Sequence, residues 1–226
     1  MNIETSLVRW LPCWRIIPSR FPPIGLFERV VDPADLEAII AIESITNPRL
    51  RDEVGDIELV PSDERISGPG TSIIMAAFTH LNPEGSRFSN GQFGIFYAGD
   101  TVKTAIRETV YHRGLFMQAT SQPRMELDQR AYTVDLEAEL HDIRGQRDRL
   151  PLLYDPIDYS SSQQLARTLR TNGSNGIVYD SVRHETGECV GIFRPKVLSN
   201  CRPERHLCYV WDGQKIGDVY EKRSLT

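Results

Sequence analysis

Short apolar runs, several of them alternating with polar residues, recur along most of the chain and predict β-strands separated by turns. We expect strands over residues 11–17, 93–98, 131–136, 177–179, 189–193, 207–211 and 216–220. The segment 71–78, TSIIMAAF, is too short and too continuously apolar to show a period, and we expect a buried strand there. Asp212 and Gly213 predict a tight turn between the last two strands.

Apolar residues at helical spacing predict helices over residues 32–46, 102–113 and 160–172. The second of these has Asp100 or Thr101 as its N-terminal cap, and Gly114 is expected to end it. One of the serines at 160–162 is expected to cap the third helix.

Two long polar stretches separate these elements. Residues 46–70 predict a long loop with little regular structure, a candidate cover for a ligand site, and residues 144–158 predict a surface connection. Many short strands interrupted by short helices predict an α+β fold with small mixed or antiparallel sheets, not a doubly wound parallel sheet. Neither a composition break nor an internal repeat divides the 226 residues, so we expect a single domain, 1–226.

Charge and composition narrow the function classes. The chain has 26 basic and 31 acidic residues, a net charge of −5, which predicts no direct binding to nucleic acid. Arg9 and Arg15 interrupt the apolar N-terminal stretch, and no apolar run approaches the roughly 20 residues of a membrane span. We therefore expect a cytoplasmic protein without a membrane segment. The four cysteines form no C-x-x-C pair, which predicts buried thiols and no metal site.

Candidate chemistry is concentrated in the segment 85–113. Arg87 lies in a glycine- and serine-rich turn, where backbone can approach a ligand closely, and Tyr97 lies on the strand that follows. Glu108 falls on the border of the apolar stripe of the helix over 102–113. An edge ion pair with Arg107, Arg113 or a neighbouring strand is the structural alternative for Glu108. His112 is interpreted as a helix C-terminal cation and is left out of the candidate site.

These motifs, in this order, resemble the RES family, which is named for an arginine, a glutamate and a serine and whose members are toxins of bacterial toxin–antitoxin pairs. The family's arginine turn is similar to residues 86–91, its tyrosine strand to 94–98, its alanine–glutamate helix to 105–108, and its serine motif to 176–183, with Ser181 as the serine.

The similarity extends over most of the chain, roughly from Trp14 to Asp212. An early family arginine matches Arg15, with Arg20 as the alternative. The chain departs from the family at the turn, because Asn90 follows Arg87 only after an inserted serine, where many relatives have arginine–tryptophan–asparagine.

The resemblance implies an ADP-ribosyltransferase-like fold and cleavage of the nicotinamide–ribose bond of NAD. By this resemblance Glu108, Arg87 and Ser181 are catalytic, and Arg15, Arg87, Tyr97 and Ser181 bind NAD. The residue types suit that chemistry, because guanidinium groups bind a diphosphate through forked hydrogen bonds and a carboxylate stabilises an oxocarbenium-like ribose. NAD is then the substrate, and no further cofactor is expected.

Three functions stay open at this point. The first is a toxin that depletes NAD as a phosphorylase or glycohydrolase, in a hetero-oligomer with a cognate antitoxin of the Xre type that blocks the active site. The second is a mono-ADP-ribosyltransferase that modifies a specific host protein. The third is a catalytically silent module that binds a nucleotide or a partner protein. The chain has no G-x-G-x-x-G helix start and no Walker A lysine loop, which argues against a dehydrogenase of the Rossmann type and a P-loop enzyme.

Overall fold

The computed structural model describes residues 3–19 and 55–225 and confirms the α+β class. The strands are β1 (Thr5–Pro18), β2 (Phe96–Gly99), β3 (Met125–Asp142), β4 (Gly176–Asp180), β5 (Glu188–Ile192), β6 (Leu198–Trp211) and β7 (Ile216–Lys222). The α-helices of the described residues are α3 (Thr71–Thr79), α4 (Val102–Gln118) and α5 (Ser160–Thr171). The helix predicted over 32–46, Arg20 and the first part of the loop predicted over 46–70 lie outside the described residues.

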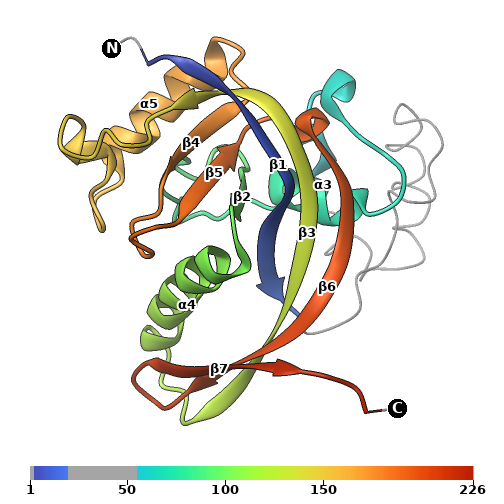
Figure 1. Ribbon diagram of the computed structural model, residues 1–226, viewed down its shortest axis with the longest axis vertical. Coiled ribbons are helices and arrows are strands. Elements are labelled where there is room, and N and C mark those ends of the chain that lie inside the picture. The colour runs from blue at the N-terminus through green and yellow to red at the C-terminus, as the bar shows by residue number, and fades with distance from the viewer. Residues whose placement is uncertain (1–2, 20–54, 226) are drawn as a thin grey trace.

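The strands join in one seven-stranded sheet of order β1-β2-β5-β4-β3-β6-β7, where small separate sheets were expected. β1 also pairs with β3, so β1, β2, β5, β4 and β3 form a closed ring of pairings. Only β3 and β4 pair in parallel; the other pairings are antiparallel. Figure 1 shows the long strands β1, β3 and β6 curving side by side, with α4 on their concave side.

The long strands extend well beyond the predicted runs. β3 has 18 residues where six were expected, and β6 has 14 where five were expected. Outside the predicted apolar runs, both strands contain exposed charged residues. The pattern of apolar residues therefore does not show where these strands begin and end. Backbone pairing with β1 and β6 continues through those positions, so the register with neighbouring strands decides the length of β3.

The prediction of a strand over residues 71–78 was wrong, because this segment forms α3. Seven of its nine residues are buried, among them Ile74 and Met75 with no exposed surface. A helix that is covered on nearly all sides carries no polar face, so its sequence shows no helical period. Gly70 precedes it with a positive φ of 79°, a backbone conformation that favours glycine.

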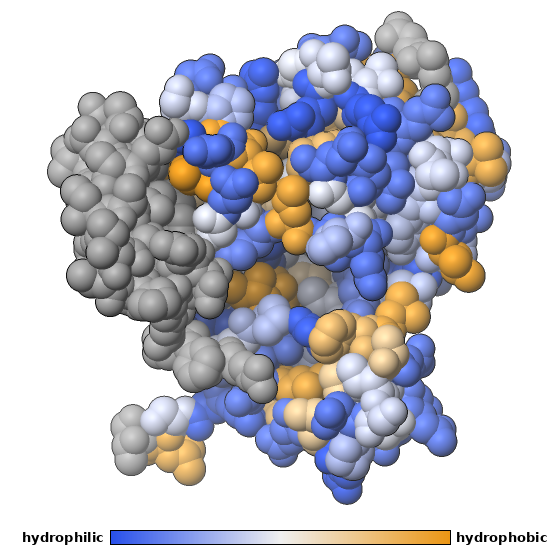
Figure 2. Space-filling view, turned by 180° about the vertical axis from the view of Figure 1, so that it is seen from behind, coloured by the Kyte–Doolittle hydropathy of each residue, from blue (hydrophilic) through white to orange (hydrophobic). Residues whose placement is uncertain are grey.

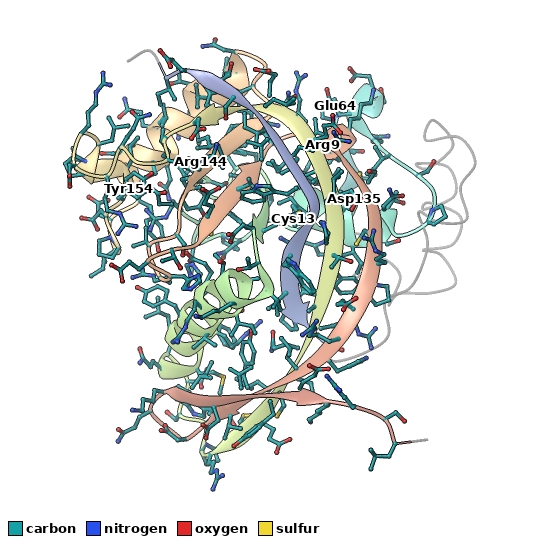
Figure 3. All side chains as sticks on the ribbon, viewed as in Figure 1. Arg9, Cys13, Glu64, Asp135, Arg144 and Tyr154 are labelled. Atoms are coloured by element: carbon teal, nitrogen blue, oxygen red, sulfur yellow. The ribbon has the colours of Figure 1, made fainter. Side chains whose placement is uncertain are left out.

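Two other predicted segments differ in detail. The connection 144–158 contains the 3₁₀ helix η5 (Pro151–Leu153) and buries Leu153 and Tyr154, so it is not simply a surface loop. Arg144, labelled in Figure 3, pairs with Asp142 at 2.6 Å and with Glu188 at 2.7 Å. These ion pairs join the end of β3 to the start of β5.

The part of the 46–70 loop that the structure describes contains two 3₁₀ helices, η3 (Ile57–Leu59) and η4 (Ser62–Glu64), and buries Ile57 and Val60. All four cysteines are buried and none of them forms a disulfide, as predicted, and burial raises the pKa of the Cys13 thiol to about 12.

Polar side chains cover most of the face seen in Figure 2, with apolar side chains in small groups between them. Among the described residues, no helix is long and apolar enough to cross a membrane. The same residues contain no group of three or more His, Cys, Asp or Glu side chains arranged to hold a metal ion. The expectation that the protein needs no metal stays a prediction.

Candidate active site

A cavity of ≈ 300 Å³ lies where α4 packs beside β1 and β2. Its lining consists of residues 14–16 of β1, the turn at 82–87, residues 97–99 of β2, one face of α4, Tyr159, Tyr179 and Cys189. Four of the five predicted site residues line it: Arg15, Arg87, Tyr97 and Glu108. The fold thus brings together residues that are up to 93 positions apart in the sequence, from Arg15 to Glu108.

Glu108 projects from the middle of α4 into the cavity. The helix begins as predicted, with Thr101 as its cap, whose hydroxyl accepts a hydrogen bond from Thr104 N at 3.2 Å. It continues through Gly114 to Gln118, beyond the predicted end, because Gly114 does not take the positive φ with which a glycine ends a helix. Within the described residues Glu108 makes no ion pair with Arg107 or Arg113, so the structural alternative is not supported.

Ser181 holds the Glu108 carboxylate in place. Its hydroxyl donates to Glu108 Oε1 at 2.5 Å and accepts from the backbone N–H groups of Arg183 at 3.2 Å and His184 at 2.9 Å. The side chain is buried and does not line the cavity. The structure thus places the Ser181 hydroxyl against Glu108 and not in the cavity, and the predicted contact of Ser181 with NAD stays a prediction.

The loop that carries Ser181 is tied to the start of α4. Thr104, fully buried, donates to Asp100 Oδ1 at 2.6 Å and lies 3.0 Å from His184 Nδ1. Gly187 N donates to His184 O, and Gly187 O accepts from Ser181 N at 2.8 Å. The loop and the helix that carries Glu108 are therefore fixed to each other close to the site.

Replacing Gly187 with alanine is expected to lower the free energy of unfolding by about 1–3 kcal/mol. An added Cβ lies 2.4 Å from Thr104 Oγ1 and 2.5 Å from His184 Nδ1, so the loop must shift. Gly114→Ala is the control, since a Cβ there meets nothing within 4 Å and alanine favours a helix. Urea unfolding of both variants measures the difference, and equal stability of the two variants contradicts the tight packing of this loop.

Arg15 reaches the cavity from β1 without an ion-pair partner among the described residues. Its Nη1 donates to Tyr97 O at 3.0 Å, and its guanidinium lies 4.6 Å from the centre of the Phe96 ring. Its Nε is buried and has no hydrogen-bond partner, and burial lowers the pKa of Arg15 to about 10. A buried cation without a counter-charge favours an anionic ligand.

Arg87 lines the same cavity from the turn that precedes β2. It is 8% exposed, donates through Nη1 to Leu153 O at 2.9 Å, and lies over the Tyr159 ring at 4.7 Å. No carboxylate of the described residues forms an ion pair with it. The site thus holds two arginines whose positions are fixed by neutral groups.

Tyr97 fixes the turn that carries Arg87. Its hydroxyl accepts from Phe88 N at 2.9 Å and lies 2.9 Å from Ser86 Oγ, while its ring lines the cavity. Burial raises the pKa of Tyr97 to about 12, so the phenol is neutral at physiological pH. Asn90, in the departure from the family pattern, does not line the cavity; its Oδ1 accepts from Gln92 N within the turn.

The sequence interpretation missed Tyr159, Tyr179 and His112 as lining residues. The two tyrosines come from the start of α5 and from β4, and no local spacing connects them with Glu108. Burial raises the pKa of Tyr179 well above its usual value. His112 follows Glu108 by four residues, on the same face of α4, which is a signal that the sequence did offer.

Comparison with known proteins identifies the family of the chain. The model of the RES domain matches residues 63–212. The chain is 31% identical over 209 residues to the uncharacterized protein y4oC of Sinorhizobium fredii, covering 92% of this chain and 86% of the relative. The crystal structure of the M. tuberculosis MbcT–MbcA toxin–antitoxin complex aligns with a TM-score of 0.46 at 12% identity, over 89% of this chain and 87% of that chain. On the domain match and the y4oC relative, the chain belongs to the RES family.

Proposed function

We propose that the chain is the toxin of a toxin–antitoxin pair and that it cleaves the nicotinamide–ribose bond of NAD. Membership of the RES family supports the toxin class. The observation that carries the proposed reaction is the cavity itself, which places the Glu108 carboxylate together with two arginines that lack a carboxylate partner in the described part of the chain.

Cleavage of the nicotinamide–ribose bond needs a negatively charged group near the ribose and does not need a general acid. Nicotinamide takes the electron pair of the bond and leaves as a neutral molecule, so no proton has to be supplied. Positive charge then develops on the ribose ring, and a fixed carboxylate stabilises it. Glu108 suits this task because the Ser181 hydroxyl fixes the carboxylate in one orientation.

The two arginines suit the diphosphate of NAD. Guanidinium groups that are already oriented lose little freedom when they bind phosphate oxygens. Arg15 is oriented by Tyr97 O and the Phe96 ring, and Arg87 by Leu153 O and the Tyr159 ring. Binding of a diphosphate also supplies a counter-charge, which neither arginine has among the described residues.

A cognate antitoxin of the Xre type that covers the cavity is part of the proposal. Membership of the RES family supports such a partner. A protein that covers the cavity of ≈ 300 Å³ would prevent NAD from reaching Glu108.

Incubation of the purified chain with NAD tests the proposal. We expect release of nicotinamide, followed by chromatography, and formation of a second product that identifies the acceptor. ADP-ribose alone indicates transfer to water, and a phosphorylated ADP-ribose that appears only with added phosphate indicates phosphorolysis. If NAD survives in both buffers, consumption of free NAD is excluded, and labelled NAD with a bacterial lysate then tests for modification of a protein.

A further inference from the structure

His112 lines the cavity, is exposed to solvent and lies next to Glu108, the residue proposed to act on the ribose. It follows Glu108 by one helical turn, and its Nε2 lies 4.0 Å from Glu108 Oε2. Its side chain is 54% exposed, whereas that of Glu108 is 20% exposed. The imidazole is therefore the more solvent-accessible of the two groups, and the Glu108 carboxylate is half-buried.

The separation of these two atoms leaves room for a water molecule. At 4.0 Å the nitrogen and the oxygen are too far apart for a direct hydrogen bond. A water oxygen about 2.8 Å from each of them satisfies both distances at once. A water at that point would lie beside Glu108, the carboxylate that the proposed function assigns to the developing positive charge.

The groups around His112 favour its neutral form. Partial burial lowers its pKa, the positive charges of Arg183 and Arg87 lower it further, and Glu108 opposes the shift. Tyr111, the neighbouring ring on α4, packs edge-on against the imidazole and lies under Arg183. With a pKa below its usual 6.5, the imidazole is uncharged at pH 7 and Nε2 can accept a proton.

We propose that His112 is the general base that makes water an acceptor of ADP-ribose at this site. The inference rests on the proposed function and adds the acceptor to it. The bond between nicotinamide and the ribose carbon breaks, and its electron pair leaves with nicotinamide. The water oxygen forms the new bond to that carbon, and its proton passes to His112 Nε2 and then to solvent.

Competition between water and azide tests this role. Water must lose a proton as it attacks, whereas azide is an anion at neutral pH and needs no base. His112→Gln is therefore expected to raise the ratio of azido-ADP-ribose to ADP-ribose at least tenfold at a fixed azide concentration, in line with general-base effects of roughly 10²–10⁴. Mass spectrometry of both products gives this ratio, which does not depend on how much of the variant is folded.

His206→Gln is the matched control, because His206 is exposed on β6 and does not line the cavity. Its product ratio should equal that of the wild type. An unchanged ratio in His112→Gln, with both products falling together, contradicts the role as a base and indicates that His112 only supports Glu108. Wild-type protein that cleaves no NAD overturns the proposed function and this inference together.

The pH dependence gives a second readout. As the pH falls through the pKa of His112, the protonated imidazole can no longer accept a proton. The wild type should then shift from ADP-ribose towards azido-ADP-ribose, measured at pH values where azide remains an anion. In His112→Gln the ratio should stay constant over the same range, and a parallel shift in both proteins contradicts the inference.

Discussion

Replacing Glu108 with glutamine is expected to slow nicotinamide release at least a hundredfold, with little change in the KM for NAD. A hundredfold loss corresponds to about 2.7 kcal/mol of transition-state stabilisation. That magnitude is reasonable for removing one negative charge about 4 Å from a developing positive charge at a partly buried site. The amide of glutamine keeps the size of the side chain and still accepts the Ser181 hydrogen bond, so the change is essentially one of charge.

Initial rates over a range of NAD concentrations measure the effect. Glu137→Gln is the matched control, because Glu137 lies on the exposed side of β3, where its described partner is Arg9 at 3.3 Å. That variant should keep the wild-type rate and thermal stability. A Glu108→Gln protein that is folded and cleaves NAD at the wild-type rate refutes the electrostatic role of Glu108.

The same variant separates the enzyme from a silent binding module. If expression of the chain slows bacterial growth by depleting NAD, Glu108→Gln should relieve the growth defect. A module that acts by holding a partner protein keeps its effect on growth, because the substitution hardly changes the size or the surface of the protein. NAD levels in the two strains, measured beside growth, decide between these cases.

The local part of the site could be predicted from the sequence. The start of α4 follows from the Thr101 cap and the apolar stripe around Ala105, and these two features place Glu108 at the border of the core. The Arg87 turn and the strand of Tyr97 are short-range features of the same kind. The order of these motifs was sufficient to indicate the RES family, which the domain match confirms.

The parts of the fold and of the site that the sequence did not predict depend on packing between distant segments. α3 shows no period because nearly every side of it is covered, so its apolar run resembled a strand. Ser181 was expected at the ligand, but its hydroxyl lies against Glu108 and accepts from the backbone N–H groups of Arg183 and His184. Tyr159 and Tyr179 join the cavity only because α5 and β4 pack beside the Arg87 turn, which no local spacing predicts.

Replacing Arg15 or Arg87 with glutamine is expected to lower kcat/KM for NAD by about ten- to a hundredfold, mainly through KM. A hydrogen bond from a charged group contributes roughly 1.5–3 kcal/mol, and each 1.4 kcal/mol is a factor of about ten. Each variant also loses a hydrogen bond to a backbone carbonyl, Tyr97 O or Leu153 O, and is expected to lose about 1–3 kcal/mol of stability, so rates are compared per folded protein. Arg107→Gln, on the exposed face of α4, is the control and should behave as the wild type.

Nicotinamide riboside has the scissile bond but no phosphate. It therefore tests whether the fall in kcat/KM of the two arginine variants comes from lost contacts with the diphosphate. The wild type should cleave it poorly, and the two arginine variants should cleave it as well as the wild type does. Glu108→Gln should lose activity on both substrates, because the charge at the ribose is needed in either case. If the arginine variants lose as much on the riboside as on NAD, Arg15 and Arg87 act on the shape of the cavity and not on the diphosphate. The comparison thus separates the two halves of the proposed site, an anionic centre that acts on the ribose and a cationic wall that holds the phosphates.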